Sequence, residues 1–218
     1  SDKIIKNCLD SLPTESKKII IENSNNINLE KELKKKYDNI EVILSSNIGM
    51  GAGNNIGLKA CKTKYAYVLN PDTKLNKDTM KNLIDTLNQV SDFTLASPLN
   101  DNQKIPNYKK TDLKQNINEN ILSVESIDGF SMLFNLKKFP DKNFFDENFF
   151  LYLENDDLCF RVKQKNEFVY VVKNSLINHI GGIATNENLE YLRNWHWSWS
   201  KFYYSKKHKG YIYALMQG

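Results

Sequence analysis

Residues 40–72 read IEVILSSNIGMGAGNNIGLKACKTKYAYVLNPD, and their hydrophobic pattern decides the predicted fold. An apolar run of strand length, Ile40–Leu44, is followed by a glycine-rich loop and a predicted helix over Asn54–Cys61. A second apolar run, Tyr65–Leu69, ends at Asn70-Pro71-Asp72, because proline cannot continue a central strand ladder. A strand, a helix and a strand in this order are typical of a parallel sheet with helices on its faces.

The same alternation continues on both sides of this stretch. Periodicity predicts helices over 2–12, 29–37, 76–90, 154–165 and 186–209, and strands over 18–22, 93–96, 127–135 and 168–172. Residues 101–120 are polar and are predicted to form a long loop or flap, and His179–Gly182 a short loop. The predicted class is α/β, with a mostly parallel central sheet flanked by helices and a helical segment at the C-terminal end.

Composition excludes several classes of protein. The chain has 218 residues, of which 40% are hydrophobic, and a formal net charge of +4. These values are too apolar and too weakly charged for a disordered chain, and the charge is too small for a nucleic-acid footprint. No apolar run is long enough to span a bilayer, and the start carries no signal-peptide pattern. Three distant cysteines indicate a reducing compartment, so a cytoplasmic location is expected.

Polar residues follow three of the predicted strands. They are Asn23-Ser24, Asn47 and Asn70-Pro71-Asp72, and ligands of such sheets bind beyond the carboxyl ends of the strands. The glycines of Gly49–Gly57 also suggest a dinucleotide loop. However, their spacing is G-x-G-x-G and then G-x-x-x-G, without the G-x-G-x-x-G that a nicotinamide cofactor needs.

Four segments together resemble one known family. They are Asn47–Gly57 and Leu69–Asp72, which match N-x-G-x-x-x-G-x-N-x-G and L-N-P-D, Phe149–Arg161, which is similar to F-F-x-Y-x-E-D-x-D-L-C-x-R, and Asn178–Gly182, which resembles a distal histidine motif. In this order they resemble family 2 glycosyltransferases of GT-A fold, with the rhamnosyltransferase-like branch closest. The resemblance runs from the first helix into the last.

The resemblance implies an inverting transfer of a sugar from a nucleotide-diphosphate donor to a hydroxyl acceptor. The acceptor expected is a growing bacterial cell-surface glycan, free or lipid-linked, and a homodimer is left open. Residues 1–185 would form the GT-A domain, with a nucleotide-binding half over 1–100 and an acceptor half over 101–185. Residues 186–218 would form an aromatic-rich C-terminal helix.

A divalent cation is expected at Asp72 and His179. The donor's diphosphate needs a cation or positive groups in order to leave, and Asp72 offers a hard oxygen ligand for Mg²⁺ or Mn²⁺. His179 would supply a second protein ligand, with donor phosphates and water completing the shell. The alternatives are a turn residue for Asp72 and a core histidine for His179.

Further site residues follow from the resemblance. Glu22-Asn23-Ser24 take the place of the family's D-N-x-S, where an acid contacts the nucleobase, and Asp128-Gly129 take the place that approaches donor sugar and acceptor. The nucleotide- and substrate-binding set is Glu22, Asn23, Ser24, Asn47, Gly49, Asn55, Asn70, Asp128, Gly129 and Arg161. The alternative for these residues is turn chemistry.

The catalytic base is not found at the position where the family has it. An inverting transfer needs a carboxylate to take the acceptor's proton, and the family's base position holds Asn155, whose carboxamide has no useful basicity. Glu154 is adjacent and is the first choice for base, while Asp157 is expected to brace loops or cap the helix. The alternative is that Glu154, Asp156 and Asp157 only complement the helix dipole.

Two departures from the family leave a second function open. Family members begin with a strand ahead of the helix that matches Asp2–Leu12, and this sequence begins at that helix. A trimmed start, a strand supplied in trans and a degenerate enzyme are the interpretations. With Asn155, this supports a catalytically impaired nucleotide-sugar-binding or scaffold protein as the alternative. A nucleotidyltransferase is disfavoured, because its G-x-G-x-x-R-type loop is not found.

The last predicted helix is rich in aromatic residues and lysine. Trp195, Trp197 and Trp199 alternate and therefore spread around a helix, so not all of them can be core. With the neighbouring lysines they suit stacking on acceptor sugars or peripheral contact at the inner face of the cell membrane. The alternative is core packing with a solvated Lys end.

Overall fold

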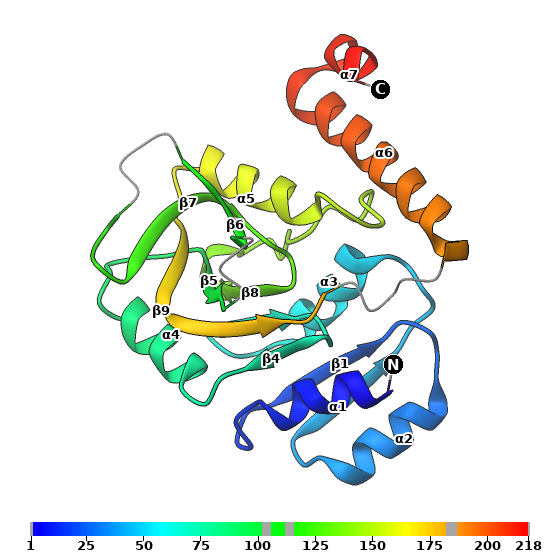
Figure 1. Cartoon of the computed structure of the whole chain (residues 1–218), viewed down its shortest axis with the longest axis vertical. Helices are drawn as coiled ribbons and strands as arrows, with labels where there is room; N and C mark the ends of the chain where they lie inside the picture. Colours follow the sequence, from blue (N-terminus) through cyan, green and yellow to red (C-terminus); the bar gives the residue numbers. More distant parts are fainter. Residues whose placement is uncertain (1, 102–105, 112–115, 182–186, 218) are drawn as a thin grey trace.

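Two β-sheets with surrounding helices form the described part of the chain, residues 2–101, 106–111, 116–181 and 187–217 of a computed structural model (Figure 1). The smaller sheet is the parallel pair β1 (Lys18–Glu22) and β2 (Ile40–Leu44). The larger sheet has the strand order β3-β8-β5-β9-β7-β6, with β4 paired to β9. Its strands are β3 (Tyr65–Leu69), β4 (Thr73–Leu75), β5 (Leu95–Asn100), β6 (Tyr108–Lys110), β7 (Ile121–Ile127), β8 (Ser131–Asn135) and β9 (Val169–His179).

The helices lie around these sheets. They are α1 (Asp2–Asp10), α2 (Ile27–Lys36), α3 (Met50–Ala60), α4 (Thr79–Leu87), α5 (Glu154–Gln164), α6 (Glu187–Lys209) and α7 (Tyr211–Gln217), with a short 3₁₀ turn over Leu136–Lys138. The side chain of Asn26 caps α2 by accepting a hydrogen bond from the N–H of Leu29 at 3.1 Å. The predicted strands 18–22, 40–44 and 65–69 are confirmed with their bounds.

The expectation of a mostly parallel sheet is wrong for strand direction in the larger sheet. Of its strand pairs, β5–β9 is parallel, while β3–β8, β5–β8, β7–β9, β4–β9 and β6–β7 are antiparallel. Parallel neighbours need a crossover of about a dozen residues, usually a helix. Between β5 and β8 the described residues contain no helix, so this part of the chain builds antiparallel pairs.

Several predicted boundaries also move. The helix expected over 54–61 already starts at Met50, and the strand expected over 168–172 continues as β9 to His179. The strand expected over 127–135 is the end of β7, a turn at Asp128-Gly129, and β8. The expected flap contains β6, and its residues 102–105 and 112–115 lie outside the described residues, as do residues 182–186.

Helix α3 joins the two sheets. It packs against both β1 and β3, and Gly57 on α3 lies against Ile21 of β1. In the described residues β1 pairs only with β2 and β3 pairs only with β8, so each keeps one edge without a strand partner. The largest core cluster lies on the other side, between the larger sheet, α5 and the aromatic residues Phe134, Phe144 and Phe145.

Helices α6 and α7 extend away from both sheets (Figure 1). One side of α6 contacts α5 and the segment before it along the helix, from His196 on Phe150 to His208 on Phe160. Among the described residues, no helix combines the length and apolarity that crossing a bilayer requires.

Gly49 controls how the segment before α5 meets α3. It has a φ of +96°, and a Cβ built there would lie 2.6 Å from the carbonyl oxygen of Phe150. That carbonyl accepts a hydrogen bond from the N–H of Met50 at 2.9 Å. Only glycine permits both the dihedral angle and the approach without strain.

We predict that Gly49→Ala destabilises the fold by about 2–4 kcal/mol, because it combines left-handed strain with a backbone clash. Gly57→Ala is the matched control in the same helix. Its Cβ would make ordinary contacts with Ile21 at 3.6 Å, so we expect a stabilisation of up to about 1 kcal/mol. Urea denaturation of both variants measures the difference in their free energies of unfolding, and equal midpoints would contradict the role assigned to Gly49.

Candidate active site

Asp72 and His179, the predicted metal ligands, lie side by side. Asp72 Oδ2 is 3.3 Å from His179 Nε2, and both side chains are partly buried. Their backbones are fixed by the antiparallel pairing of β4 with β9, in which Thr73 faces His179, and by a hydrogen bond from the N–H of Ile180 to the carbonyl of Asp72 at 3.1 Å. Residues 107 positions apart in sequence therefore meet at one sheet edge.

The surroundings of this pair favour a charged carboxylate. The hydrogen bond with His179 lowers the pKa of Asp72, against the opposing effect of partial burial. The ring of Phe130 stacks on the imidazole, with centroids 4.0 Å apart and planes at 14°. Phe130 was not predicted as a site residue, because no spacing in the sequence links positions 130 and 179.

The donor chemistry of the pair fits a hard divalent cation. Two neighbouring ligands in an octahedral Mg²⁺ shell, at about 2.1 Å from the ion, lie about 3.0 Å apart, close to the distance seen here. Among the described residues, no group of three or more His, Cys, Asp or Glu side chains is arranged to hold a metal ion. A cation at Asp72 and His179 would thus need further ligands from a substrate or water.

The turn Asp128-Gly129 lies next to this edge. The N–H of Asn70 donates to the carbonyl of Phe130 at 2.8 Å, which joins the end of β3 to the residue after the turn. Asp128 is exposed. Partial desolvation raises its pKa, and Asp156 raises it further, while Lys109 and His179 act in the opposite direction.

Gly129 marks the meeting point of three elements. A Cβ added there would lie 3.4 Å from Met50 Cε, 3.5 Å from Asn155 Cβ and 3.6 Å from Glu154 Oε1. The turn after β7, the start of α3 and the start of α5 therefore converge around this glycine. A Cβ at this position would be in van der Waals contact with all three elements.

Glu154 is a buried carboxyl at the first position of α5. Its residue is 1% exposed, and its Oε2 is buried with no hydrogen-bond partner among the described residues. Burial raises its pKa to about 7; its own backbone N–H opposes this, and Asp156 adds to it. Near neutral pH this carboxyl therefore exchanges between its protonated and charged forms.

The neighbours of Glu154 have separate partners. Asn155 Nδ2 donates to the carbonyl of Ile127 at 2.9 Å, which ties the start of α5 to the end of β7. Asp156 pairs with Lys109 on β6 at 2.7 Å. Lys109 had no signal in the sequence, because the segment around it shows no period.

At the end of β1, Glu22 closes a turn. Its carboxylate accepts hydrogen bonds from the N–H of Ser24 at 3.2 Å, from the Ser24 hydroxyl at 2.6 Å and from the N–H of Asn26. Both Glu22 and Ser24, predicted to bind nucleotide, thus have turn contacts, which was the alternative considered from sequence.

Asn23 differs from its two neighbours. Its Nδ2 donates to the carbonyl of Gly49 at 3.3 Å, and its Oδ1 is buried without a partner in the described residues. It lies against Gly53 on α3, where an added Cβ would be 3.3 Å from Nδ2. Asn23 and Gly49 are therefore brought together as predicted, with one acceptor atom left over.

Asn47 and Asn55 have structural contacts. Asn47 Oδ1 accepts from the N–H of Gly49 at 3.3 Å. Asn55 is buried, and its amide exchanges two hydrogen bonds with the backbone of Phe145, at 2.9 and 3.0 Å, while Nδ2 also donates to Glu147 at 2.8 Å. The amide of Asn55 therefore holds the segment before α5, and its expected place beside the nucleotide stays a prediction.

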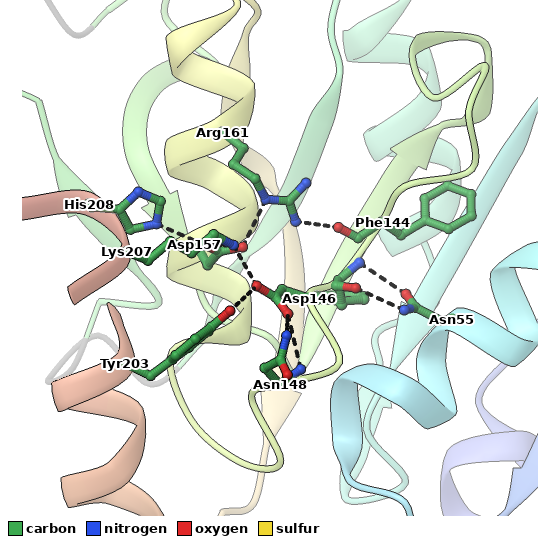
Figure 2. Close-up of polar contacts among 10 residues, drawn as sticks. Asn55, Phe144, Asp146, Asn148, Asp157, Arg161, Tyr203, Lys207 and His208 are labelled. Atoms are coloured by element: carbon green, nitrogen blue, oxygen red, sulfur yellow. Dashed lines mark hydrogen bonds and ion pairs between the residues drawn. The ribbon is translucent and has the colours of Figure 1, made fainter. Parts of the chain in front are cut away.

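Asp157 and Arg161 contact one another and the residues around them on α5 and α6 (Figure 2). Asp157 is fully buried and contacts Arg161 Nε at 2.8 Å, Lys207 Nζ at 2.7 Å and His208 Nε2 at 2.8 Å. Arg161 also donates to the carbonyl of Phe144. Arg161 thus has structural partners, and the substrate-binding role expected for it stays a prediction. Asp157 braces the fold, because its side chain contacts Lys207 and His208 of α6.

Asp146, which sequence reasoning missed, completes this anchor cluster of Asp146, Asp157, Arg161, Lys207 and His208 (Figure 2). It accepts hydrogen bonds from Lys207 at 2.6 Å and from the Tyr203 hydroxyl at 3.0 Å. Burial alone would raise its pKa, but Lys207 and other donors lower it to about 2. A cavity of about 450 Å³ opens beside this cluster and not at the Asp72 edge.

A comparison with protein families assigns the chain. Residues 2–161 match the model of glycosyl transferase family 2, which covers most of the chain. Taken with the sheet edge that joins Asp72, His179 and the Asp128-Gly129 turn, this match identifies the chain as a member of glycosyl transferase family 2, with a GT-A fold.

One curated relative is an archaeal enzyme. The chain is 26% identical over 185 residues to the low-salt glycan biosynthesis hexosyltransferase Agl10 of Haloferax volcanii. The match covers 76% of this chain and 59% of the relative, so the chain spans little more than half the length of that protein.

Solved structures share the fold at low identity. The mannosyltransferase PcManGT from Pyrobaculum calidifontis, in complex with GDP-Man and Mn²⁺, has a TM-score of 0.69 and 8% identity, covering 95% of this chain and 61% of that one. The inositol-1-phosphate CTP transferase from T. maritima has a TM-score of 0.54 and 15% identity, covering 90% and 84%. Because both identities are low, these likenesses establish the fold alone.

We predict that Glu154 makes stability fall as pH rises. Its folded pKa of about 7 lies above the ordinary value of 4.5, so the folded state binds the extra proton between these pH values. The native state therefore loses stability between about pH 4.5 and 7, by up to about 3 kcal/mol. Glu154→Gln should remove this part of the pH dependence.

Urea denaturation of the wild type and Glu154→Gln at pH 5.5 and pH 8 measures it. Relative to the wild type, the free energy of unfolding of Glu154→Gln should be higher at pH 8 than at pH 5.5. Glu147→Gln, an exposed acid before α5, is the control and should leave the wild-type slope unchanged. If the free energy of unfolding changes with pH equally in the wild type and in Glu154→Gln, the prediction is contradicted, because burial then does not raise the pKa of Glu154.

Proposed function

We propose that this chain is a metal-dependent inverting glycosyltransferase that moves a sugar from a nucleotide-diphosphate donor to a hydroxyl of a glycan acceptor. The observation that carries the proposal is the Asp72–His179 contact of 3.3 Å beside the Asp128-Gly129 turn. Family membership supports sugar transfer, and the printed descriptions of relatives, a hexosyltransferase of glycan biosynthesis and a mannosyltransferase with GDP-Man and Mn²⁺, support the donor and cation classes.

In this proposal Asp72 and His179 hold the cation through one carboxylate oxygen and one imidazole nitrogen. A bound Mg²⁺ or Mn²⁺ would neutralise the charge that develops on the leaving diphosphate. The lowered pKa of Asp72 keeps its carboxylate charged at neutral pH, and the stacked Phe130 holds the imidazole plane. Asn23, with its unpartnered Oδ1 beside Gly49, is the proposed nucleotide contact.

The proton acceptor is proposed among the carboxyls around Gly129. Asn155 cannot act, since a carboxamide is not basic. Glu154 has a pKa of about 7, which suits a general base, and its Oε1 lies at Gly129. Glu154 is nearly inaccessible, so the acceptor hydroxyl can reach it only if the turn at Gly129 moves. Asp128 is the exposed second choice, with its raised pKa.

A second function remains open because of two observations. Asn155 occupies the expected base position, and its amide donates a hydrogen bond to the carbonyl of Ile127. Glu154 is buried next to Gly129. Both features suit a chain that binds a nucleotide sugar without transferring it.

For the transferase, the acceptor is proposed as a cell-surface glycan, bacterial or archaeal, and the protein as cytoplasmic.

We expect Asp72→Ala to abolish the metal-dependent part of donor binding. Titration calorimetry with a panel of nucleoside diphosphates and nucleotide sugars, with Mn²⁺ and with EDTA, measures this part. The variant should bind in Mn²⁺ only as weakly as the wild type binds in EDTA, because the cation loses its charged ligand. Asp78→Ala removes an exposed acid at the start of α4 and is the charge-matched control. Unchanged Mn²⁺-dependent donor binding by Asp72→Ala would exclude Asp72 as a ligand of the cation.

The base assignment is tested by kcat in donor-turnover assays. Glu154→Gln should lower kcat about 100-fold or more if Glu154 accepts the proton, with a smaller effect of Asp128→Asn. The reverse order would assign the base to Asp128. A wild type without turnover that gains activity on Asn155→Asp would instead support the binding-protein alternative, since that substitution restores a carboxylate at the expected position.

A further inference from the structure

The solvent-facing side of α6 carries a continuous row of aromatic rings. Trp195 stacks on Trp199 with centroids 6.3 Å apart and planes at 7°, Trp199 contacts Phe202 at 6.2 Å, and Phe202 contacts Tyr211 of α7 at 6.2 Å. Trp195 is 52% exposed and Tyr211 57%. Large apolar side chains in such a row are costly to leave in water, so the row requires a partner.

Most of the contacts that attach α6 to the rest of the chain lie outside this row, although Trp199 Nε1 donates to the carbonyl of Asn148 at 3.5 Å and the Trp199 ring stacks on Tyr203. Attachment uses another side of the helix, where Ser200 donates to the carbonyl of Leu151 at 2.8 Å and Lys207 and His208 enter the anchor cluster (Figure 2). Tyr203 likewise contacts Phe149 and Asp146. The rings of Trp195, Phe202 and Tyr211, and the exposed part of Trp199, are therefore available without loosening the helix.

Helix α7 extends the apolar surface. It follows Gly210, which has a φ of +93°, and its sequence YIYALMQ has no charged residue. Ala214 is buried, whereas Ile212 is 73% exposed, Leu215 57% and Met216 75%. Side chains at 212, 215 and 216 share one face of a helix, since residues three and four apart are neighbours.

The charges around this surface have one sign. Residues 191–218 contain five Lys or Arg and no Asp or Glu. Lys206 Nζ lies 6.0 Å from the centroid of the Tyr211 ring and Lys209 Nζ 4.7 Å from that of Tyr213, so cations border the row. A second copy docked by the same face would bring like charges together, because a two-fold interface pairs a patch with itself. An anionic surface is the complementary partner.

We propose that the row Trp195, Trp199, Phe202 and Tyr211, with the outer face of α7, docks on an anionic lipid bilayer. The Trp and Tyr rings would lie at headgroup level, and Ile212, Leu215 and Met216 would enter the acyl boundary. Lys206 and Lys209 would face lipid phosphates. Lipid binding does not depend on sugar transfer, so this proposal stands or fails separately from the proposed function.

Vesicle flotation tests the proposal with the full chain. The wild type should float with phosphatidylcholine vesicles that contain phosphatidylglycerol, and weakly with phosphatidylcholine alone. The triple variant Ile212→Ser, Leu215→Ser, Met216→Ser should bind at least about tenfold more weakly, because it removes the inserting side chains. Lys206→Glu with Lys209→Glu should lose the preference for phosphatidylglycerol.

The matched control is Ile27→Ser with Ile117→Ser, which replaces exposed apolar residues away from α6 and α7 and should float like the wild type. All variants should keep the wild-type thermal transition, since the substituted side chains are exposed. Absence of flotation with either vesicle, or equal flotation of the triple variant and the control, would overturn the proposal. Light scattering that shows a dimer abolished by the triple variant would assign the surface to a second copy instead.

Discussion

The carboxylate of Asp157 is the constraint on which the second half of the structure depends. It is fully buried, and a buried charge is tolerated only when it is paired and hydrogen-bonded. Arg161 comes from its own helix, and Lys207 and His208 come from α6, so the pairing fixes one helix against the other. Lys207 also reaches Asp146, which extends the same network to the segment before α5.

The anchor and the candidate site share one helix but use different sides of it. Asp157 points from the first turn of α5 toward α6, while Glu154 and Asn155 point toward Gly129. Asn155 and Asp157 are about 200° apart around the helix and so lie on roughly opposite sides of it, whereas Glu154 lies about 60° from Asp157 and reaches Gly129 from the first position of the helix. Gly49 and Gly51 permit the close packing between α3 and the segment before α5, because a Cβ would lie 2.6 Å from the carbonyl oxygen of Phe150 at the first and 3.1 Å from Phe145 Cβ at the second. A rigid anchor thus holds one end of the helix whose other side faces the site.

Much of the fold was predictable from local patterns. The strands 18–22, 40–44 and 65–69 were predicted with their bounds because each is a short apolar run between turn residues. The meeting of Asp72 with His179 was also anticipated, through resemblance to the family and not through spacing. Strand direction in the larger sheet was missed, because the alternation of strands and helices stops after β5 and apolar runs carry no sign of direction.

Side-chain roles were harder to predict than elements. Asn55, Asp157 and Arg161 belong to recognisable motifs, yet their partners are the backbone of Phe145, the side chains of α6 and the carbonyl of Phe144. A motif fixes which residue stands at a position but not which side of the helix faces the ligand. Asp146 and Lys109 have no motif at all, and their contacts arise only when distant segments pack together.

The place of β9 in the larger sheet has a consequence for how the chain folds. It comes last among the described strands of this sequence, yet it pairs with β5, β7 and β4. Until it emerges, those strands lack the neighbour that they have in the finished sheet. Pairings between strands so far apart in sequence form slowly, and open edges invite association with other chains. Until β9 is made, the nascent chain therefore exposes strand edges at which it can associate with other chains.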